Sequence, residues 1–241
     1  MPDLDLVGLS KEPSRIGLWT RAITERHLET VAEIGVSRGV FAQALLEGCP
    51  GITTYYLVDP WRHLEDWNKP LNKSDAEFSV VFKAALDRTA PWEGKRVILR
   101  GRTTEVIDEI PDGSLDLVYV DGDHTLRGIS IDLIRTWPKV RPGGLLGGDD
   151  FARTIWQHRR NFEPTLVFPF AVHFAEAMGA PIAALPNNQF LMHKVDTGFT
   201  FHDLTGGYGD LTLREAFAPA KASHRPALMR WPLRRKGLPH G

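Results

Sequence analysis

Acidic side chains follow two apolar segments of this 241-residue chain, each where a buried strand is expected to end. Asp121, Asp123 and His124 come directly after the run "LVYV", and Asp149 and Asp150 end "GGLLGGDD". A carboxylate next to a core strand is costly to desolvate unless something compensates it, and neighbouring carboxylates raise each other's pKa. A divalent cation with oxygen ligands removes both problems. We therefore predict a metal site, most simply for Mg²⁺, at Asp121, Asp149 and Asp150.

A second set of polar residues indicates a nucleoside ligand. The segment "EIGVSRG" has Gly35 and Gly39 after a predicted strand, but it lacks the G-x-G-x-x-G spacing that brings the backbone against a pyrophosphate. Glu33 would oppose a pyrophosphate, whereas it could accept hydrogen bonds from the amine of a cationic ligand. Asp59 ends the next predicted strand, where a carboxylate can take both hydroxyls of a ribose. A ligand with a ribose and a positive centre fits these residues better than NAD.

The fold has to bring these residues together, and the order of the predicted elements indicates how. Segments typical of strands alternate with segments typical of helices, the strands at 30–36, 54–59, 95–101, 114–121 and 143–150 and the helices at 40–48, 75–90, 103–110 and 126–140. This alternation is typical of right-handed βαβ units in a parallel sheet, whose ligands bind at the carboxyl ends of the strands. A helix at 167–179 and two strands joined by a tight "NN" turn follow.

Taken together, these motifs resemble the class I S-adenosylmethionine (SAM) methyltransferases. E-x-G-x-x-x-G follows the first strand, an acid ends the second, "GRTTE" follows the third and "VDGDH" the fourth. The resemblance covers residues 30–195 as the methyltransferase domain. It implies an α/β, Rossmann-like doubly wound sheet of seven strands, mostly parallel with an antiparallel final strand. Residues 1–29 are then expected to be a leader with an amphipathic helix, and 196–241 a partly irregular C-terminal extension.

Carried over by position, the resemblance implies a SAM site along this edge of the sheet. The residues that it implies are Glu33, Gly35, Ser37 and Gly39 for the methionine part, Asp59 for the ribose, Arg102, Thr103 and Trp61 for the adenine, and Asp121 beside them. Simpler roles remain open for some of them. Asp59 before Pro60 is also turn chemistry, and Thr103 can cap a helix. Trp61 can simply pack its loop down.

The predicted metal region is similar to that of the metal-dependent O-methyltransferases. Those of the catechol and caffeoyl-CoA types have an Asp at the end of the fourth strand and an Asp-Asn pair at the end of the fifth. Asp121 and Asp149 match these positions, whereas Asp150 replaces the Asn, as in the macrocin-type enzymes that methylate sugars of macrolide antibiotics. The position of the catalytic base in the catechol type is His124 here, and imidazole accepts protons near neutral pH. His124 could instead cap the following helix.

The resemblance implies a Mg²⁺-dependent O-methyltransferase of secondary metabolism that activates one hydroxyl of a small diol, either a sugar of a natural product or a catechol. A hydroxylase on the same scaffold would need a redox metal, and the usual two-His-one-carboxylate set is not visible in the sequence. A non-catalytic SAM-binding protein would have no need of "GGDD" or His124. Both remain alternatives.

Composition and charge limit the kinds of partner and the cellular location that we expect. The net charge of −1 gives no reason to expect nucleic acid, and no apolar run is long enough to span a bilayer. The N-terminus lacks the features of a signal peptide, and the single cysteine, Cys49, excludes an internal disulfide. We expect a cytoplasmic protein with a small-molecule acceptor, homo-oligomeric by family resemblance. The basic residues from Lys221 to Lys236 suggest a solvated tail, with a binding tail as the alternative.

Overall fold

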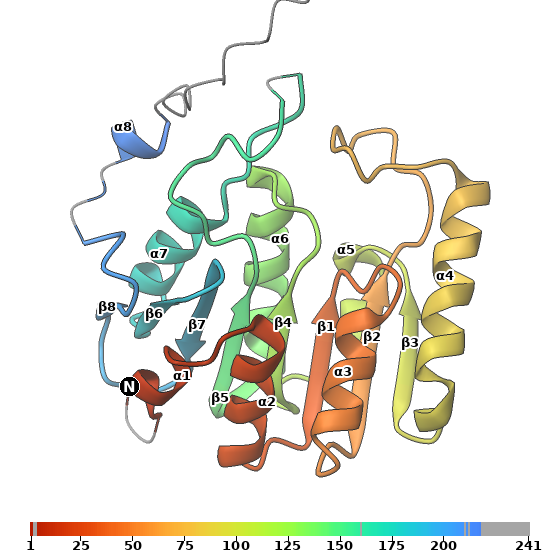
Figure 1. Ribbon diagram of the computed structural model, residues 1–241, viewed down its shortest axis with the longest axis horizontal. Helices are drawn as coiled ribbons and strands as arrows, with labels where there is room; N and C mark the ends of the chain where they lie inside the picture. Colours follow the sequence, from red (N-terminus) through yellow and green to blue (C-terminus); the bar gives the residue numbers. More distant parts are fainter. Residues whose placement is uncertain (2–3, 160, 210, 212, 218–241) are drawn as a thin grey trace, which may run out of the picture.

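A central sheet with helices on both faces organises the protein, as seen in a computed structural model that describes residues 1, 4–159, 161–209, 211 and 213–217 (Figure 1). The strands are β1 (Thr30–Ile34), β2 (Thr54–Asp59), β3 (Arg96–Arg100), β4 (Leu115–Val120), β5 (Val140–Gly148), β6 (Ile182–Leu185), β7 (Gln189–His193) and β8 (Phe201–Asp203). Their order across the sheet is β3-β2-β1-β4-β5-β7-β6-β8. Among these strands only β7 runs antiparallel to its neighbours.

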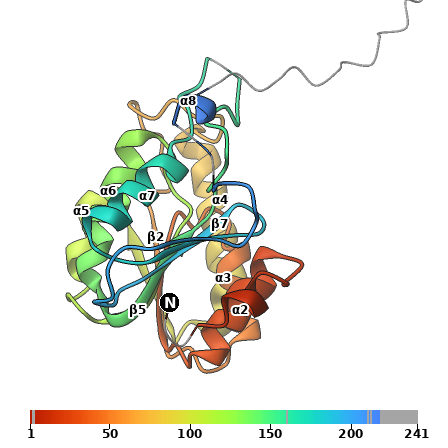
Figure 2. The same ribbon diagram turned by 90° about the vertical axis from the view of Figure 1, so that its left-hand side faces the viewer.

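The helices connect these strands and cover the sheet. They are α1 (Leu6–Leu9), α2 (Arg15–Glu25), α3 (Val40–Gly48), α4 (Asp75–Thr89), α5 (Thr103–Val106), α6 (Leu126–Thr136), α7 (Val167–Ala177) and α8 (Leu213–Ala216), with short 3₁₀ turns at Ala90–Trp92, Ile107–Glu109 and Trp137–Lys139. Figure 2 shows α2, α3 and α4 on one face of the sheet and α5, α6 and α7 on the other. The predicted doubly wound α/β fold is therefore confirmed.

The predicted number of seven strands was wrong, because β8 adds an eighth. This strand of three residues pairs in parallel with β6, where Phe201 lies opposite Ile182. Its side chains are only half-buried, so its sequence has no apolar alternation to reveal it. The predicted antiparallel strand is confirmed as β7, and β8 follows it in the chain. The tight turn before β7 is as predicted, with Asn187 and Asn188 at φ 61° and 55°.

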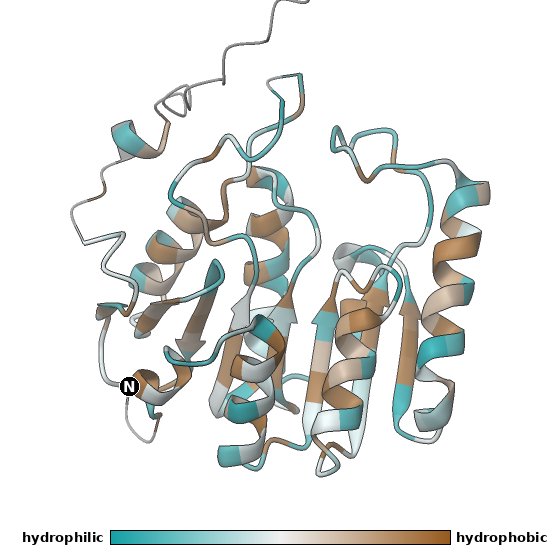
Figure 3. Cartoon of the chain, in the orientation of Figure 1, coloured by the Kyte–Doolittle hydropathy of each residue, from teal (hydrophilic) through white to brown (hydrophobic). Residues whose placement is uncertain are grey.

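Alternation along the central strands divides the core between the two faces of the sheet. On β4, Leu117 and Tyr119 pack on the side of α2 and α3, while Val118 and Val120 pack on the side of α6 and α7. Figure 3 shows hydrophobic residues along the central strands, and hydrophobic and hydrophilic residues mixed on the helices. Trp19 of α2 is completely buried, and its indole Nε1 donates to Oε1 of Gln189 on β7 at 2.8 Å. The N-terminal helix is thus part of this core.

The turn after β1 brings the backbone of β1 against that of β4. Gly35 has φ 90°, and a Cβ at this position would lie 2.2 Å from the backbone oxygen of Asp121. Only glycine adopts this conformation without strain and permits such an approach. The short distance between these two backbones places Asp121 beside the turn, so the glycine shapes the site as well as the turn.

We expect Gly35→Ala to lower the free energy of unfolding by about 2 kcal/mol or more, because it combines backbone strain with a steric clash. Urea unfolding followed by circular dichroism would measure this. Gly94→Ala is the matched control, since a Cβ there would meet nothing within 4 Å, and its stability should stay close to wild type. Equal stability of the two variants would contradict this account of the turn.

Candidate functional site

A cavity of about 320 Å³ lies at the carboxyl ends of the parallel strands, where the sequence predicts the ligand. The loop 60–74 and α4 close it on one side, and α5 and α6 close it on the other. Of the residues predicted to hold a cofactor, those that line it are Gly35, Ser37, Asp59, Arg102, Thr103 and Asp121. The strand order brings these six residues together from four separate segments of the chain.

Asp59, at the end of β2, is held in place by two backbone amides. Ser37 N donates to Oδ2 at 2.9 Å, and Trp61 N donates to Oδ1 at 2.7 Å. Burial raises the pKa of Asp59 to about 6, although these backbone hydrogen bonds act in the opposite direction. Each carboxylate oxygen keeps a lone pair that can accept a further hydrogen bond. Asp59 therefore stabilises the turn that follows β2 and also lines the cavity.

Three residues predicted to contact the cofactor lie behind the cavity wall and not in it. The side chain of Glu33 is buried in the core on one face of the sheet, where the Tyr55 hydroxyl donates to its Oε2 at 2.8 Å. Burial raises the pKa of Glu33 well above the usual range. Trp61 is buried, its ring packs 4.8 Å from that of Phe82, and its Nε1 donates to Ser37 O at 2.8 Å. Gly39, at φ 70°, is the residue directly before α3. These residues shape the loops that form the wall, which differs from the predicted direct contacts.

Ion pairs with α5, α6 and the residue after β3 hold the loop 60–74 against the cavity. Asp66 pairs with Arg102, which follows β3, and with Arg127 on α6. The hydrogen bonds from these two guanidinium groups lower the pKa of Asp66 to about 2. Arg62 pairs with Glu105 of α5 at 2.5 Å. Arg102, predicted to contact adenine, thus also holds this loop closed.

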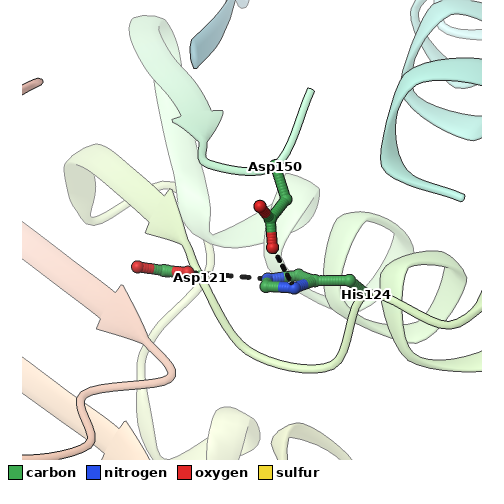
Figure 4. A group of neighbouring side chains, drawn as sticks. All are labelled: Asp121, His124 and Asp150. Atoms are coloured by element: carbon green, nitrogen blue, oxygen red, sulfur yellow. Dashed lines mark ion pairs between the residues drawn. The ribbon is translucent and has the colours of Figure 1, made fainter. Parts of the chain in front are cut away.

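Asp121, His124 and Asp150 form a group that could hold a metal ion (Figure 4). One ligand atom from each lies within 4.8 Å of the others. His124 Nδ1 contacts Asp150 Oδ2, and its Nε2 lies 3.5 Å from Asp121 Oδ1. That nitrogen is buried and makes no hydrogen bond with the described residues. Burial alone would lower the pKa of His124, but the two carboxylates outweigh it and raise the pKa to about 10.

The predicted metal ligand Asp149 lies outside this group. Its Oδ1 accepts hydrogen bonds from Gln189 Nε2 and from Asp150 N, each at 2.7 Å, and its Oδ2 pairs with Arg15. The same Arg15 Nη1 donates to Asp121 Oδ2 at 2.9 Å. Protein donors therefore engage both oxygens of Asp149, whereas Asp150 faces His124.

Arg15 is the site residue that sequence reasoning missed. It is the first residue of α2, its guanidinium lies 5.3 Å from the ring centre of Phe41, and it bridges two carboxylates from β4 and β5. No motif spacing connects it to those strands. One signal could have found it. A cation in the first turn is unfavourable for the helix dipole, and this first turn has no acid to offset it.

A smaller cavity of about 80 Å³ lies beside the group formed by Asp121, His124 and Asp150. It shares four residues with the larger cavity, namely Trp67, Leu71, Asp121 and Gly122, and His124, Lys69, Pro70 and His158 complete its wall. Lys69 is buried, and its Nζ donates to Glu163 O at 2.9 Å and to Thr165 Oγ1 at 3.2 Å. It joins the loop 60–74 to the segment 151–166. His173, by contrast, is exposed on α7.

Two predictions concern parts of the chain away from this site. The basic stretch from Lys221 to Lys236 lies outside the described residues. Within the described part of the chain, none of the helices combines the length and apolar character needed to cross a membrane.

Comparison with known proteins identifies the domain. Residues 32–151 match the family described as "Methyltransferase domain". A curated relative, the uncharacterized protein y4gI of Sinorhizobium fredii, is 27% identical over 166 residues. The match covers 64% of this chain and only 17% of that protein, so most of the relative's length lies outside it.

Solved structures share the fold. A structure described as a candidate caffeoyl-CoA O-methyltransferase from Staphylococcus aureus has a TM-score of 0.56 and 14% identity, covering 78% of this chain and 86% of its own. The O-methyltransferase TomG from Streptomyces achromogenes, in complex with SAM, has a TM-score of 0.52 and 15% identity, covering 78% and 82%. An O-methyltransferase from Bacillus cereus, in complex with SAH, has a TM-score of 0.53 and 13% identity, covering 78% and 84%.

Proposed function

We propose that the protein transfers a methyl group from SAM to a hydroxyl of a small molecule, because residues 32–151 match a methyltransferase domain. One observation carries the proposal. A cavity of about 320 Å³ and a smaller cavity beside Asp121, His124 and Asp150, which could hold a metal ion, share Asp121 and three further residues. Cofactor and acceptor would therefore meet at the end of β4.

The residues of the larger cavity fit SAM, whose sulfonium supplies the methyl group. Asp59 offers one oxygen to each ribose hydroxyl, because its position is already set by two backbone amides. Gly35 lets the ligand approach the backbone of the turn. The cavity wall also contains apolar side chains, including Leu71, Phe78 and Val81, which can cover a flat base.

We propose that Asp121, His124 and Asp150 hold a divalent cation, which would supply positive charge next to the acceptor hydroxyl. The buried Nε2 of His124, without a hydrogen-bond partner in the described chain, supports this assignment. Mg²⁺ prefers oxygen ligands, so a nitrogen among the donors makes Mn²⁺ a second candidate. We propose His124 as a ligand in place of the predicted base, with the cation displacing the ring proton that His124 shares with the two carboxylates in the absence of metal. This group has one histidine, unlike the two of the oxygenase type.

The lining of the smaller cavity supports a proposal for the class of acceptor. Trp67, Pro70 and Leu71 give it an apolar wall that suits a ring, and Asp121 and His124 give it a polar end. Two carboxylates on one divalent ion leave little positive charge, which disfavours a polyanionic acceptor. We propose a neutral diol, either a sugar ring of a natural product or a catechol.

A methyl-transfer assay with radiolabelled SAM and a panel of catechols and glycosides tests this function. Each reaction is run after EDTA treatment and again with Mg²⁺ or Mn²⁺ added back. We expect EDTA to lower the rate by at least about tenfold and one of the metals to restore it. An equal rate in chelator would contradict the metal role alone. Absence of SAM binding in calorimetry would contradict the whole proposal.

A further inference from the structure

A buried carboxylate that none of the motifs singled out forms part of the wall of the larger cavity. Asp132 lies on α6, is 5% exposed, and accepts a hydrogen bond at 2.5 Å from Thr103 Oγ1 to its Oδ1. Its Oδ2 lies on the side of Gly122, where a Cβ added to that glycine would come within 3.2 Å of it. Thr103 and Gly122 also line the cavity.

The carboxyl group of Asp132 has more acceptor capacity than its surroundings satisfy. Two carboxylate oxygens can accept about four hydrogen bonds. The described residues supply the Thr103 hydroxyl and the backbone amide of Asp123, and no lysine or arginine among them forms an ion pair with it. Burial correspondingly raises the pKa of Asp132 to about 7. A buried, partly satisfied carboxylate is costly unless a ligand completes it.

The position of Asp132 in the cavity indicates which part of the ligand it meets, given the proposed function. The sulfonium has to lie near Asp121 at the end of β4, and the ribose near Asp59 at the end of β2. Along the order β4-β1-β2-β3, the base then lies toward the end of β3, where Thr103 follows the strand. Asp132 is hydrogen-bonded to Thr103 and its Oδ2 lies beside Gly122, so it stands in the cavity wall between the residues that follow β3 and those that follow β4.

We propose that Asp132 is a specificity-determining residue that accepts a hydrogen bond from the exocyclic 6-amino group of the cofactor's adenine. This group is a donor in adenine, and its place is taken by an oxygen acceptor in hypoxanthine. A carboxylate oxygen facing it therefore favours adenosyl over inosyl ligands. Thr103 acts as a positioning residue, because its hydroxyl fixes Oδ1 and with it the orientation of Oδ2.

Calorimetry with S-adenosylhomocysteine (SAH) and S-inosylhomocysteine tests the proposal on the full chain. Wild type should bind SAH about 10- to 100-fold more tightly, the range of one hydrogen bond to a charged group. In Asp132→Asn, the Thr103 hydroxyl still needs an acceptor, so we expect the side-chain amide to place its oxygen where Oδ1 was. The amide nitrogen then takes the place of Oδ2. That donor suits the inosyl oxygen, and the preference for SAH should fall at least about tenfold.

The controls separate recognition from stability. Asp87→Asn, on the exposed surface of α4, should keep the wild-type preference. Thr103→Val should weaken the preference as Asp132→Asn does, whereas Thr103→Ser should retain it. A lower melting temperature with an unchanged ratio of the two affinities would overturn the proposal and leave Asp132 as a link between α5 and α6. A wild-type protein that binds neither ligand would overturn the proposed function as well.

Discussion

Asp150→Asn is expected to reduce the affinity for Mn²⁺ by more than about 100-fold, measured by electron paramagnetic resonance of the free ion. Asp150 contributes one carboxylate of the proposed ligand group, and the neutral amide is a much weaker metal ligand. Asparagine suits this test, because residue 150 has φ 58°, a conformation that asparagine tolerates better than alanine does. The backbone should therefore keep its shape while the charge is lost.

Asp149→Asn is the matched comparison, since the two residues are neighbours with the same side chain. Asp149 is engaged by Arg15 and Gln189, so its loss should lower Mn²⁺ affinity only about 10-fold, as for residues that orient ligands. The reverse order of effects, with Asp149→Asn the more severe, would show that the ion lies between Asp121 and Asp149. Arg15 would then have to leave its place in the presence of metal.

Asp59→Asn is expected to weaken SAH binding by about 100-fold or more, because two hydrogen bonds from ribose hydroxyls to a charged acceptor are affected. Calorimetry measures the affinity, and a 2′,3′-dideoxy analogue of SAH provides the control. The analogue lacks the hydroxyls, so wild type and variant should bind it with similar weakness. A 100-fold loss for this analogue too would mean that the variant acts through the loop and not through the ribose.

The same interaction predicts a pH dependence. The pKa of Asp59 is raised by burial to about 6, so the ligand-accepting carboxylate is replaced by the protonated form as the pH falls below that value. Wild-type affinity for SAH should fall over this range. Asp59→Asn should lack this part of the dependence, which calorimetry at pH 5 and pH 8 would show.

Much of the fold could be predicted from local sequence, because strands and helices of the central unit have strong periodic patterns. The loop and turn residues Gly35 and Asp59 were also found, since their spacing reflects the geometry of the strand ends. The strand β8 was not predicted, because its three half-buried residues show almost no alternation of apolar and polar side chains. The domain boundaries, the cytoplasmic location and the homo-oligomeric state stay predictions.

The arrangement within the site was harder to predict than its location. Spacing places Asp149 and Asp150 equally at the end of β5, and only tertiary contacts decide between them. Arg15 and Gln189, distant in sequence, occupy Asp149 and leave Asp150 to His124. Glu33 belongs to the expected motif, yet it lies within β1. The alternation of side chains along the strand directs it into the core on one face of the sheet, away from the cavity. Asp132 carries no motif, because its partner Thr103 is 29 residues away.

The N-terminal helix α2 lies outside the matched region 32–151, yet it is built into the catalytic unit. Trp19 packs against Tyr119 in the interior, and Arg15 pairs with Asp121 and Asp149 at the carboxyl ends of β4 and β5. A fragment that begins at residue 32 would expose apolar side chains of the sheet that α2 covers, Tyr119 among them. It would also leave Asp121 and Asp149 to repel each other. Helix α2 is therefore integral to the fold, and its removal would cost both a packed indole and a counter-charge for two carboxylates.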